Sequence, residues 1–268
     1  MPEALGRVLT IAGSDSSGGA GIQADIKTVT ALGGYAASAI TAVTVQDTRG
    51  VAAVYPIPPP IIAGQIRAVL ADIGADAIKV GMLGEADAAR AVVETLDGWP
   101  AIPLIVDPVM TAKGGARLLA DEAIAPLRRL IARAALVTPN APEAAALTGR
   151  PVATTDDLRA AGEALLAAGA RAVLMKGGHI PGARVIDLLI TSSGETQFEG
   201  ERIETRHTHG TGCTLASACA TGLAQGLTLQ DAVARAWAYT AEAIRRAPGF
   251  GAGAGPIDHA WPTRNEER

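Results

Sequence analysis

The sequence has 268 residues, of which 49% are hydrophobic, and its formal net charge is −4. This length and apolar content predict a single large α/β domain over residues 1–268, because no Pro/Ser-rich or charged spacer divides the chain. Interspersed charges and an aromatic content of 3% argue against nucleic acid as the main partner.

The two cysteines, Cys213 and Cys219, fit neither a disulfide framework nor a zinc pattern, which favours a reducing compartment. The first seven residues lack the shape of a signal peptide, and no apolar run is long enough to span a bilayer. We therefore expect a cytoplasmic protein without membrane association.

The first apolar run, residues 8–12, predicts a buried strand that leads into a glycine-rich loop. This loop has the glycine spacing of a phosphate-binding P-loop. However, Gly19 and Ala20 stand where that motif requires Lys and Ser or Thr, so the P-loop interpretation fails.

Residues 19–24 also match the dinucleotide-binding fingerprint, with Asp47 about the expected ~20 residues further on. Two carboxylates, Asp15 and Asp25, would then face an anionic cofactor, which weakens an assignment as an NAD-dependent oxidoreductase. A plain turn without a ligand stays a further alternative, since glycines also serve ordinary turns.

Apolar runs and helical patterns then alternate along the chain, which is typical of an α/β fold. Strands are predicted over residues 39–45, 77–80, 104–106, 135–138, 172–175, 185–190 and 196–203, and helices over 22–32, 62–73, 85–96, 157–168, 215–220 and 229–244.

Several predicted strands end at residues suited to ligand binding, and open α/β sheets bind ligands at the carboxyl ends of their strands. Gln46 carries an amide donor and acceptor that suit the edge of a heteroaromatic ring. Asp107 is well placed to hold Mg²⁺, and Met82 could form an apolar pocket wall. The alternatives are turn caps for Gln46 and Asp107 and a core position for Met82.

Asn140 and Glu143 lie three residues apart at a helix entry, so both can face one site. An ordinary helix N-cap explains the same spacing. Lys176 follows the strand at 172–175 and suits a nucleotide phosphate, although a single lysine is often only a solvated charge.

The loop at residues 208–214 carries the strongest single signal. Gly210 and Gly212 allow a tight turn into a helix whose first N–H groups have no internal partner, and such a helix end favours anions. Cys213 lies beside that anion site, where a thiol can act as a base or nucleophile.

Together these motifs resemble the hydroxymethylpyrimidine/phosphomethylpyrimidine kinases of thiamine biosynthesis, within the ribokinase-like superfamily. The resemblance runs from about residue 7 to about residue 260. It rests on Ala12-Gly13-Ser14-Asp15, residues 17–25, Lys79-Val80-Gly81-Met82, Asp107-Pro108-Val109-Met110, Thr138-Pro139-Asn140, Lys176-Gly177-Gly178-His179 and residues 208–214.

The resemblance implies a homodimer with a mainly parallel sheet flanked by helices on both faces. It implies an ATP- and Mg²⁺-dependent kinase that phosphorylates 4-amino-5-hydroxymethyl-2-methylpyrimidine and then its monophosphate. By this resemblance the pyrimidine is bound by Gln46, Asp25, Gly13, Ala20 and Met82, and the nucleotide by Lys176, Asn140, Thr211 and Gly212. The resemblance places Mg²⁺ near Asp107 and Glu143. It forms the anion hole and its base from Gly210, Thr211, Gly212 and Cys213.

Three departures from the family pattern stand out. Ser16 replaces the usual proline, His207 the common asparagine, and the tail at 250–256 lacks the usual lysine and histidine. The departing tail weakens any nucleotide role for that segment. The alternatives are a pyridoxal kinase or a dual-substrate kinase, and a non-catalytic pyrimidine-binding protein.

Overall fold

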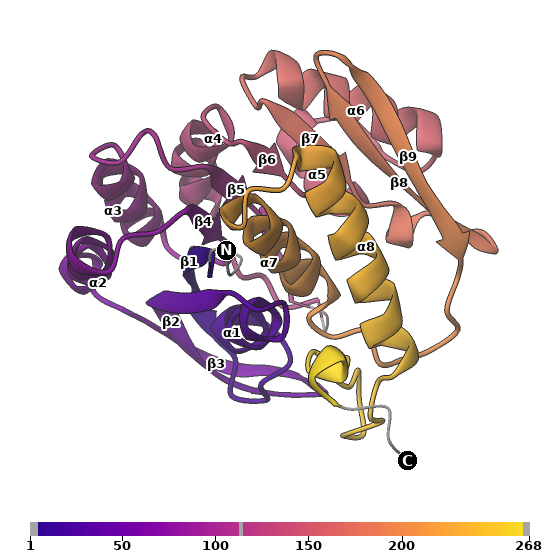
Figure 1. Cartoon of the computed structure of the whole chain (residues 1–268), viewed down its shortest axis with the longest axis horizontal. Helices are drawn as coiled ribbons and strands as arrows, with labels where there is room; N and C mark the ends of the chain where they lie inside the picture. Colours follow the sequence, from indigo (N-terminus) through magenta and orange to yellow (C-terminus); the bar gives the residue numbers. More distant parts are fainter. Residues whose placement is uncertain (1–4, 113–114, 265–268) are drawn as a thin grey trace.

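The computed structural model describes residues 5–112 and 115–264. The expectation about a signal peptide rests partly on residues 1–4, which lie outside this range. The described strands form one nine-stranded sheet in the order β3-β2-β1-β4-β5-β6-β7-β8-β9 (Figure 1). These strands are β1 (Arg7–Ser14), β2 (Tyr35–Asp47), β3 (Gly50–Pro56), β4 (Ala77–Val80), β5 (Leu104–Val106), β6 (Leu136–Val137), β7 (Ala172–Met175), β8 (Arg184–Thr191) and β9 (Gly194–Glu201).

The centre of the sheet is parallel and both edges are antiparallel. Strands β2, β1, β4, β5, β6 and β7 run parallel, whereas β3 closes one edge and the β8–β9 hairpin the other. The helices are α1 (Gly21–Ala31), α2 (Pro59–Asp72), α3 (Ala86–Leu96), α4 (Ile124–Ile131), α5 (Ala141–Thr148), α6 (Thr155–Ala167), α7 (Thr211–Ala224) and α8 (Leu229–Arg245).

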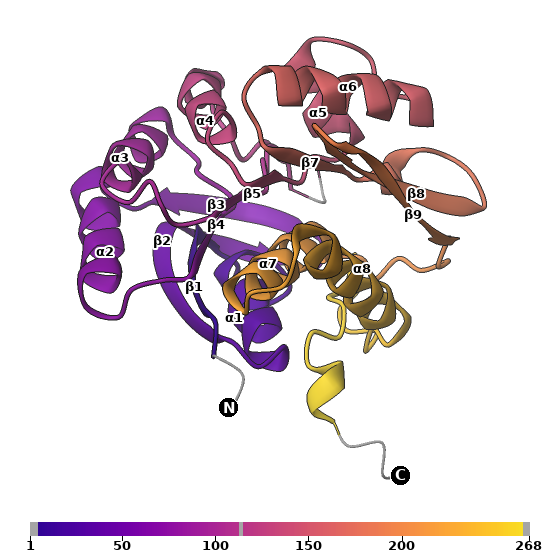
Figure 2. The ribbon, with the colours of Figure 1, turned by 45° about the horizontal axis from the view of Figure 1, so that its top comes forward.

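The helices cover both faces of the sheet (Figure 2). One buried apolar cluster joins the sheet to α2, α3, α4, α5 and α6, and a second joins it to α1, α7 and α8. The strands between them are mostly apolar on both sides, as is typical of parallel strands under two helical layers, with Thr10 of β1 and Lys79 of β4 as buried polar residues. This arrangement is the predicted layering.

Every strand and helix predicted from the sequence is present, with ends shifted by a few residues. Strand β3 and helix α4 were not predicted. None of the helices in the described ranges is long and apolar enough to cross a membrane.

The parallel strands place their carboxyl ends along one edge of the sheet. Strands β1, β4, β5, β6 and β7 all end there, and the loops that follow them carry most of the residues singled out from the sequence. Helix α7 begins at the same edge, because its first turn lies against Lys176, which follows β7. The fold therefore brings the predicted site residues together.

Candidate active site

A cavity of about 750 Å³ lies at this edge of the sheet. Its wall contains twelve of the thirteen site residues predicted from the sequence, and Asp25 is the exception. These twelve are Gly13, Ala20, Gln46, Met82, Asp107, Asn140, Glu143, Lys176, Gly210, Thr211, Gly212 and Cys213.

The first turn of α7 is set against the early glycine loop. Gly210, its N-cap, has φ 85°, in the left-handed region that favours glycine. A Cβ built on Gly210 would lie 1.7 Å from the Gly19 carbonyl oxygen, so this close approach also requires glycine. The predicted helix start therefore opens onto the cavity, although the Thr211 amide already donates a hydrogen bond to the Thr208 carbonyl oxygen at 3.4 Å.

Lys176 and Asp107 form a nearly buried ion pair beside that helix start. Lys176 Nζ lies 2.9 Å from Asp107 Oδ1 and 3.8 Å from Glu143 Oε2. Burial alone would lower the pKa of Lys176, but these two carboxylates outweigh it and raise the pKa. A Cβ on Gly212 would lie only 3.1 Å from Lys176 Nζ, so the ammonium group and the α7 amides can face the same anion.

Asn140 and Glu143 form a capping box at the start of α5, as the alternative interpretation expected. Asn140 Oδ1 accepts a hydrogen bond from the Glu143 amide at 2.9 Å, and Glu143 Oε2 accepts one from the Asn140 amide at 2.8 Å. Burial raises the pKa of Glu143 to about 7, with Lys176 acting in the opposite direction. Capping does not exclude a functional role, because both residues also line the cavity.

The donor set fits a magnesium ion bound together with phosphate. Asp107 Oδ2 is buried and, within the described residues, has no hydrogen-bond partner, while Oδ1 accepts from Lys176 and, at 3.2 Å, from the Thr138 hydroxyl. No cluster of three or more His, Cys, Asp or Glu side chains in the described ranges could form a metal cage. Magnesium commonly uses one or two carboxylates plus substrate phosphates, so Asp107 with Glu143 suits it.

Cys213 lies half-buried on the cavity wall at the start of α7. Burial raises the pKa of its thiol to about 12, and the opposing influence of Lys79 does not compensate. From the sequence, the helix start favours a lower pKa, and nearby phosphates a higher one. In the structure desolvation dominates, so the thiol is neutral at neutral pH.

Asp25 does not lie where the resemblance implied. Its side chain is fully buried and does not line the cavity, and both of its oxygens accept hydrogen bonds from Lys79 at 2.9 Å. Ser217 of α7 donates a further hydrogen bond at 2.6 Å. A buried lysine needs a carboxylate partner, so Asp25 joins α1 to β4 and α7, and a direct contact with a ligand in the cavity is not supported.

Asp15 and His209 form a contact that the sequence analysis missed. His209 Nε2 lies 2.8 Å from Asp15 Oδ2, although the two residues are 194 positions apart. Both side chains are buried, and the contact joins the early glycine loop to the late one. The polar stretch Asp15-Ser16-Ser17 at the end of a strand could have indicated that Asp15 is a buried hydrogen-bond acceptor. Its partner, His209, could not be predicted from local spacing because it lies so far along the chain.

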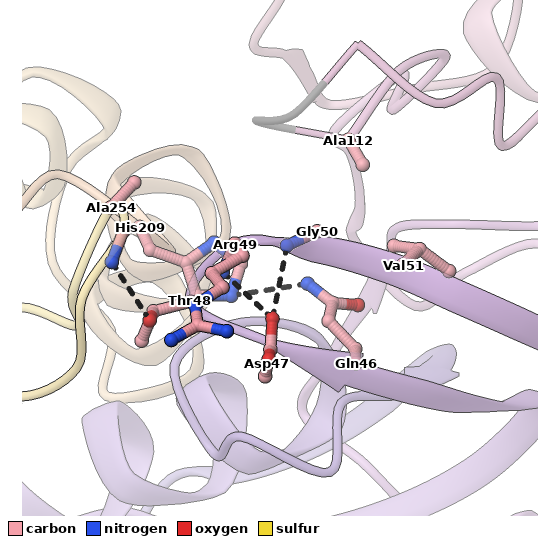
Figure 3. Close-up of a pocket in the computed structure, with 10 residues that line it drawn as sticks. Gln46, Asp47, Thr48, Arg49, Gly50, Val51, Ala112, His209 and Ala254 are labelled. Carbon is pink, nitrogen blue, oxygen red and sulfur yellow. Dashed lines mark hydrogen bonds between the residues drawn. The ribbon is translucent and has the colours of Figure 1, made fainter.

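A smaller cavity of about 310 Å³ is lined by Gln46, His209 and the β2–β3 turn (Figure 3). Asp47 Oδ1 accepts hydrogen bonds from the backbone amides of Arg49 and Gly50, so this carboxylate closes the turn. Asp47 thus has a turn role, which removes the support it lent to the dinucleotide interpretation.

The tail at residues 250–256, which differs from the family pattern, packs on the same turn. The Gly253 amide donates to Thr48 Oγ1 at 3.1 Å, and the His209 amide donates to the Gly255 carbonyl at 3.1 Å. A Cβ on Gly253 would lie 2.0 Å from the Thr48 carbonyl oxygen. The tail therefore supports the Gln46 side of the site through its backbone, which needs neither the lysine nor the histidine that it lacks.

Comparison with known proteins identifies the family. A model of the family described as phosphomethylpyrimidine kinase matches residues 15–258. The chain belongs to the phosphomethylpyrimidine kinase family. A hydroxymethylpyrimidine/phosphomethylpyrimidine kinase of Streptomyces coelicolor is 49% identical over 255 residues, covering 95% of this chain and 94% of that protein. Its Escherichia coli counterpart is 46% identical over 259 residues, covering 94% and 97%.

Solved structures confirm the ribokinase-like fold expected of this kinase family. A phosphomethylpyrimidine kinase of Clostridium difficile matches with a TM-score of 0.80 and 43% identity, covering 89% of this chain and 99% of that one. An ADP complex of Bacillus subtilis pyridoxal kinase matches with a TM-score of 0.90 and 34% identity, covering 96% and 98%. The chain also spans about half of a bifunctional thiamine biosynthesis protein of Geobacter sulfurreducens, at 48% identity.

Proposed function

We propose that this kinase transfers the γ-phosphoryl group of ATP to 4-amino-5-hydroxymethyl-2-methylpyrimidine and then to its monophosphate. The observation that carries the proposal is one cavity that holds both halves of the chemistry. Gln46 lines this cavity together with the start of α7, Lys176 and Asp107. Membership of the family supports the choice of substrate.

Phosphoryl transfer depends mainly on positioning and charge neutralisation. Lys176 and the first amides of α7 would bind the transferring phosphoryl group, and Asp107 with Glu143 would hold Mg²⁺. Bound Mg²⁺ supplies positive charge to the phosphate oxygens. Cys213, at the start of α7, would accept the proton of the attacking alcohol in its thiolate form, the minor form of a thiol whose pKa burial raises to about 12.

Pyridoxal is the second candidate substrate. The observation that favours it is the close structural match with pyridoxal kinases, one of which was solved with the ATP analogue AMP-PCP and pyridoxal at a TM-score of 0.89. Its ring also carries a hydroxymethyl group, so the same geometry would serve both substrates.

The deciding experiment is a coupled ADP-release assay with the pyrimidine alcohol, its monophosphate and pyridoxal, run on the wild type and on Gln46→Ala. We expect the two pyrimidines to be preferred in the wild type. We expect Gln46→Ala to raise the KM for the pyrimidine far more than the KM for ATP, because the lost amide leaves ring polar groups unpaired. Preference for pyridoxal, or equal effects on both KM values, would contradict the assignment.

We further propose that the chain forms one kinase domain, works as a homodimer and resides in the cytoplasm. The continuous sheet from β3 to β9 supports the single domain. The apolar side chains exposed on β2 and β3 support the dimer; among them Val45 is 62% and Tyr55 69% exposed.

A further inference from the structure

The Asp15 carboxylate fixes the position of one hydrogen atom on His209. Asp15 accepts hydrogen bonds from the Ser17 hydroxyl at 2.8 Å and from the backbone amides of Ser17 and Ala20, each at 2.8 Å. Burial disfavours its charged form, but His209 and Ser17 outweigh this and lower the pKa of Asp15. An ionised carboxylate only accepts, so His209 Nε2, 2.8 Å from Oδ2, must be the donor.

That donor lies beside the Gln46 carboxamide. The amide nitrogen of Gln46 lies 3.2 Å from His209 Nε2 (Figure 3). Two N–H groups cannot hydrogen-bond to each other, whereas a carboxamide oxygen at this position would share the His209 hydrogen with Asp15. The two ends of a carboxamide have nearly the same shape, so their neighbours decide which end lies where.

Thr44 imposes the same choice from the other end of the amide. Its hydroxyl donates to the Ser14 carbonyl at 2.9 Å and lies 3.3 Å from Gln46 Oε1. A hydroxyl has a single hydrogen, and the Ser14 carbonyl can only accept it. Thr44 Oγ1 therefore offers Gln46 a lone pair, which an amide N–H fits and an amide oxygen does not.

We propose that these two contacts hold the Gln46 carboxamide in one orientation, with its oxygen toward His209 and its nitrogen toward Thr44. Asp15 and Ser14 act as positioning residues, since neither needs to contact the substrate. One N–H and one oxygen lone pair of the amide remain for a ligand, in a fixed order. This order sets the ring edge that the site accepts.

The inference rests on the proposed function and sharpens its specificity. An aminopyrimidine offers an amine donor beside a ring-nitrogen acceptor, and its 4-oxo analogue offers the reverse, a carbonyl acceptor beside a ring N–H donor. A Gln46 amide held in one orientation binds the 4-amino ring edge and rejects the 4-oxo ring edge. An amide free to turn over accepts both.

The test compares kcat/KM for 5-hydroxymethyl-2-methylpyrimidine carrying either the 4-amino or the 4-oxo group. In Thr44→Val/His209→Phe we expect the preference for the amine to fall at least about tenfold, because neither neighbour dictates the orientation any longer. Thr44→Ser keeps the hydroxyl and should keep the preference. Thr10→Val, which removes a buried hydroxyl from β1, is the matched control and should keep it too.

An unchanged preference in the double variant would overturn the inference. If the wild type phosphorylates neither pyrimidine, the proposed function is wrong, and the orientation of the Gln46 amide is then decided by a measurement that needs no substrate. In NMR spectra of the wild type, the Gln46 side-chain NH₂ protons, assigned by their loss in Gln46→Leu, should show cross-relaxation with the Thr44 methyl group. Cross-relaxation with the His209 ring alone would overturn the orientation, even if the double variant does not fold.

Discussion

Loss of the Cys213 thiol should affect the two proposed phosphorylation steps unequally, which makes its role as a base testable. In the first step the nucleophile is a neutral alcohol, so a positioned base contributes about 10²–10⁴-fold. In the second step it is a phosphate oxygen, already anionic at neutral pH because the second phosphate pKa lies near ~6. We therefore expect Cys213→Ala to slow the first step far more than the second in single-turnover measurements. Equal losses in both steps would remove the base role and leave the kinase function intact.

The raised pKa of Cys213 adds a pH dependence to the same comparison. With a pKa of about 12, the thiolate fraction grows about tenfold for each pH unit between pH 7 and 9. The rate of the first step should rise with pH over this window in the wild type. Cys213→Ala, measured as the control, should show a flatter profile, and a profile shared by both proteins would assign the pH dependence to another group.

Asp107 carries the prediction about metal. Asp107→Asn removes negative charge at the one carboxylate whose Oδ2 is buried and, in the described part of the chain, without a partner. We expect the Mg²⁺ concentration needed for half-maximal activity to rise about 10–100-fold. The exposed Asp97→Asn serves as the control for a lost surface carboxylate. Unchanged metal dependence in Asp107→Asn would leave that residue only its ion pair with Lys176.

At the scale of elements, the start of α7 depends on the absence of a side chain at Gly210. Gly210→Ala places a Cβ 1.7 Å from the Gly19 carbonyl oxygen, so the loop must shift and the first amides of α7 with it. We expect kcat to fall about 10²–10³-fold in both steps, as when a donor to a developing anion is lost.

Gly226→Ala is the matched control for this variant. Gly226 has the same φ of 85°, but a Cβ there would meet no atom within 4 Å. Both variants should therefore lower the melting temperature, and only Gly210→Ala should lower kcat. A comparable kcat in the two variants would mean that the α7 amides do not act on the phosphoryl group.

The strands and helices predicted from the sequence were those marked by a pattern of apolar and polar residues close together in the chain. Apolar runs ending in glycine or polar residues marked the parallel strands. Eight of the predicted site residues lie at or just after the carboxyl ends of these strands, and four more lie at the start of α7. Strand β3 escaped prediction because its side chains are mostly exposed and its pairing with β2 is what makes it a strand. The burial of Asp25 and the Asp15–His209 contact also depend on partners far along the chain, which no local period reveals.

At the scale of the whole molecule, the exposed face of β2 and β3 predicts the assembly. Val43 pairs with Tyr55 and Val45 with Ala53, so these side chains share one face of the ribbon. Val45→Lys/Tyr55→Lys should convert the proposed dimer to a monomer in size-exclusion chromatography with light scattering, because buried lysines oppose association. Ile73→Lys, at the end of α2, is the control. A wild-type monomer would refute the dimer outright.

The position of α7 and α8 after every strand has a consequence for protein synthesis. Side chains such as Ile105 and Leu174 face these helices, so in a nascent chain that has not yet reached residue 211 they lack most of their cover. Ribosome-bound chains arrested at residue 205 should therefore remain sensitive to protease, whereas released full-length chains become resistant. Because the first amides of α7, which we propose bind the phosphoryl group, arrive with that helix, the ribosome completes the proposed catalytic site and the protective layer of the sheet in the same stretch of translation.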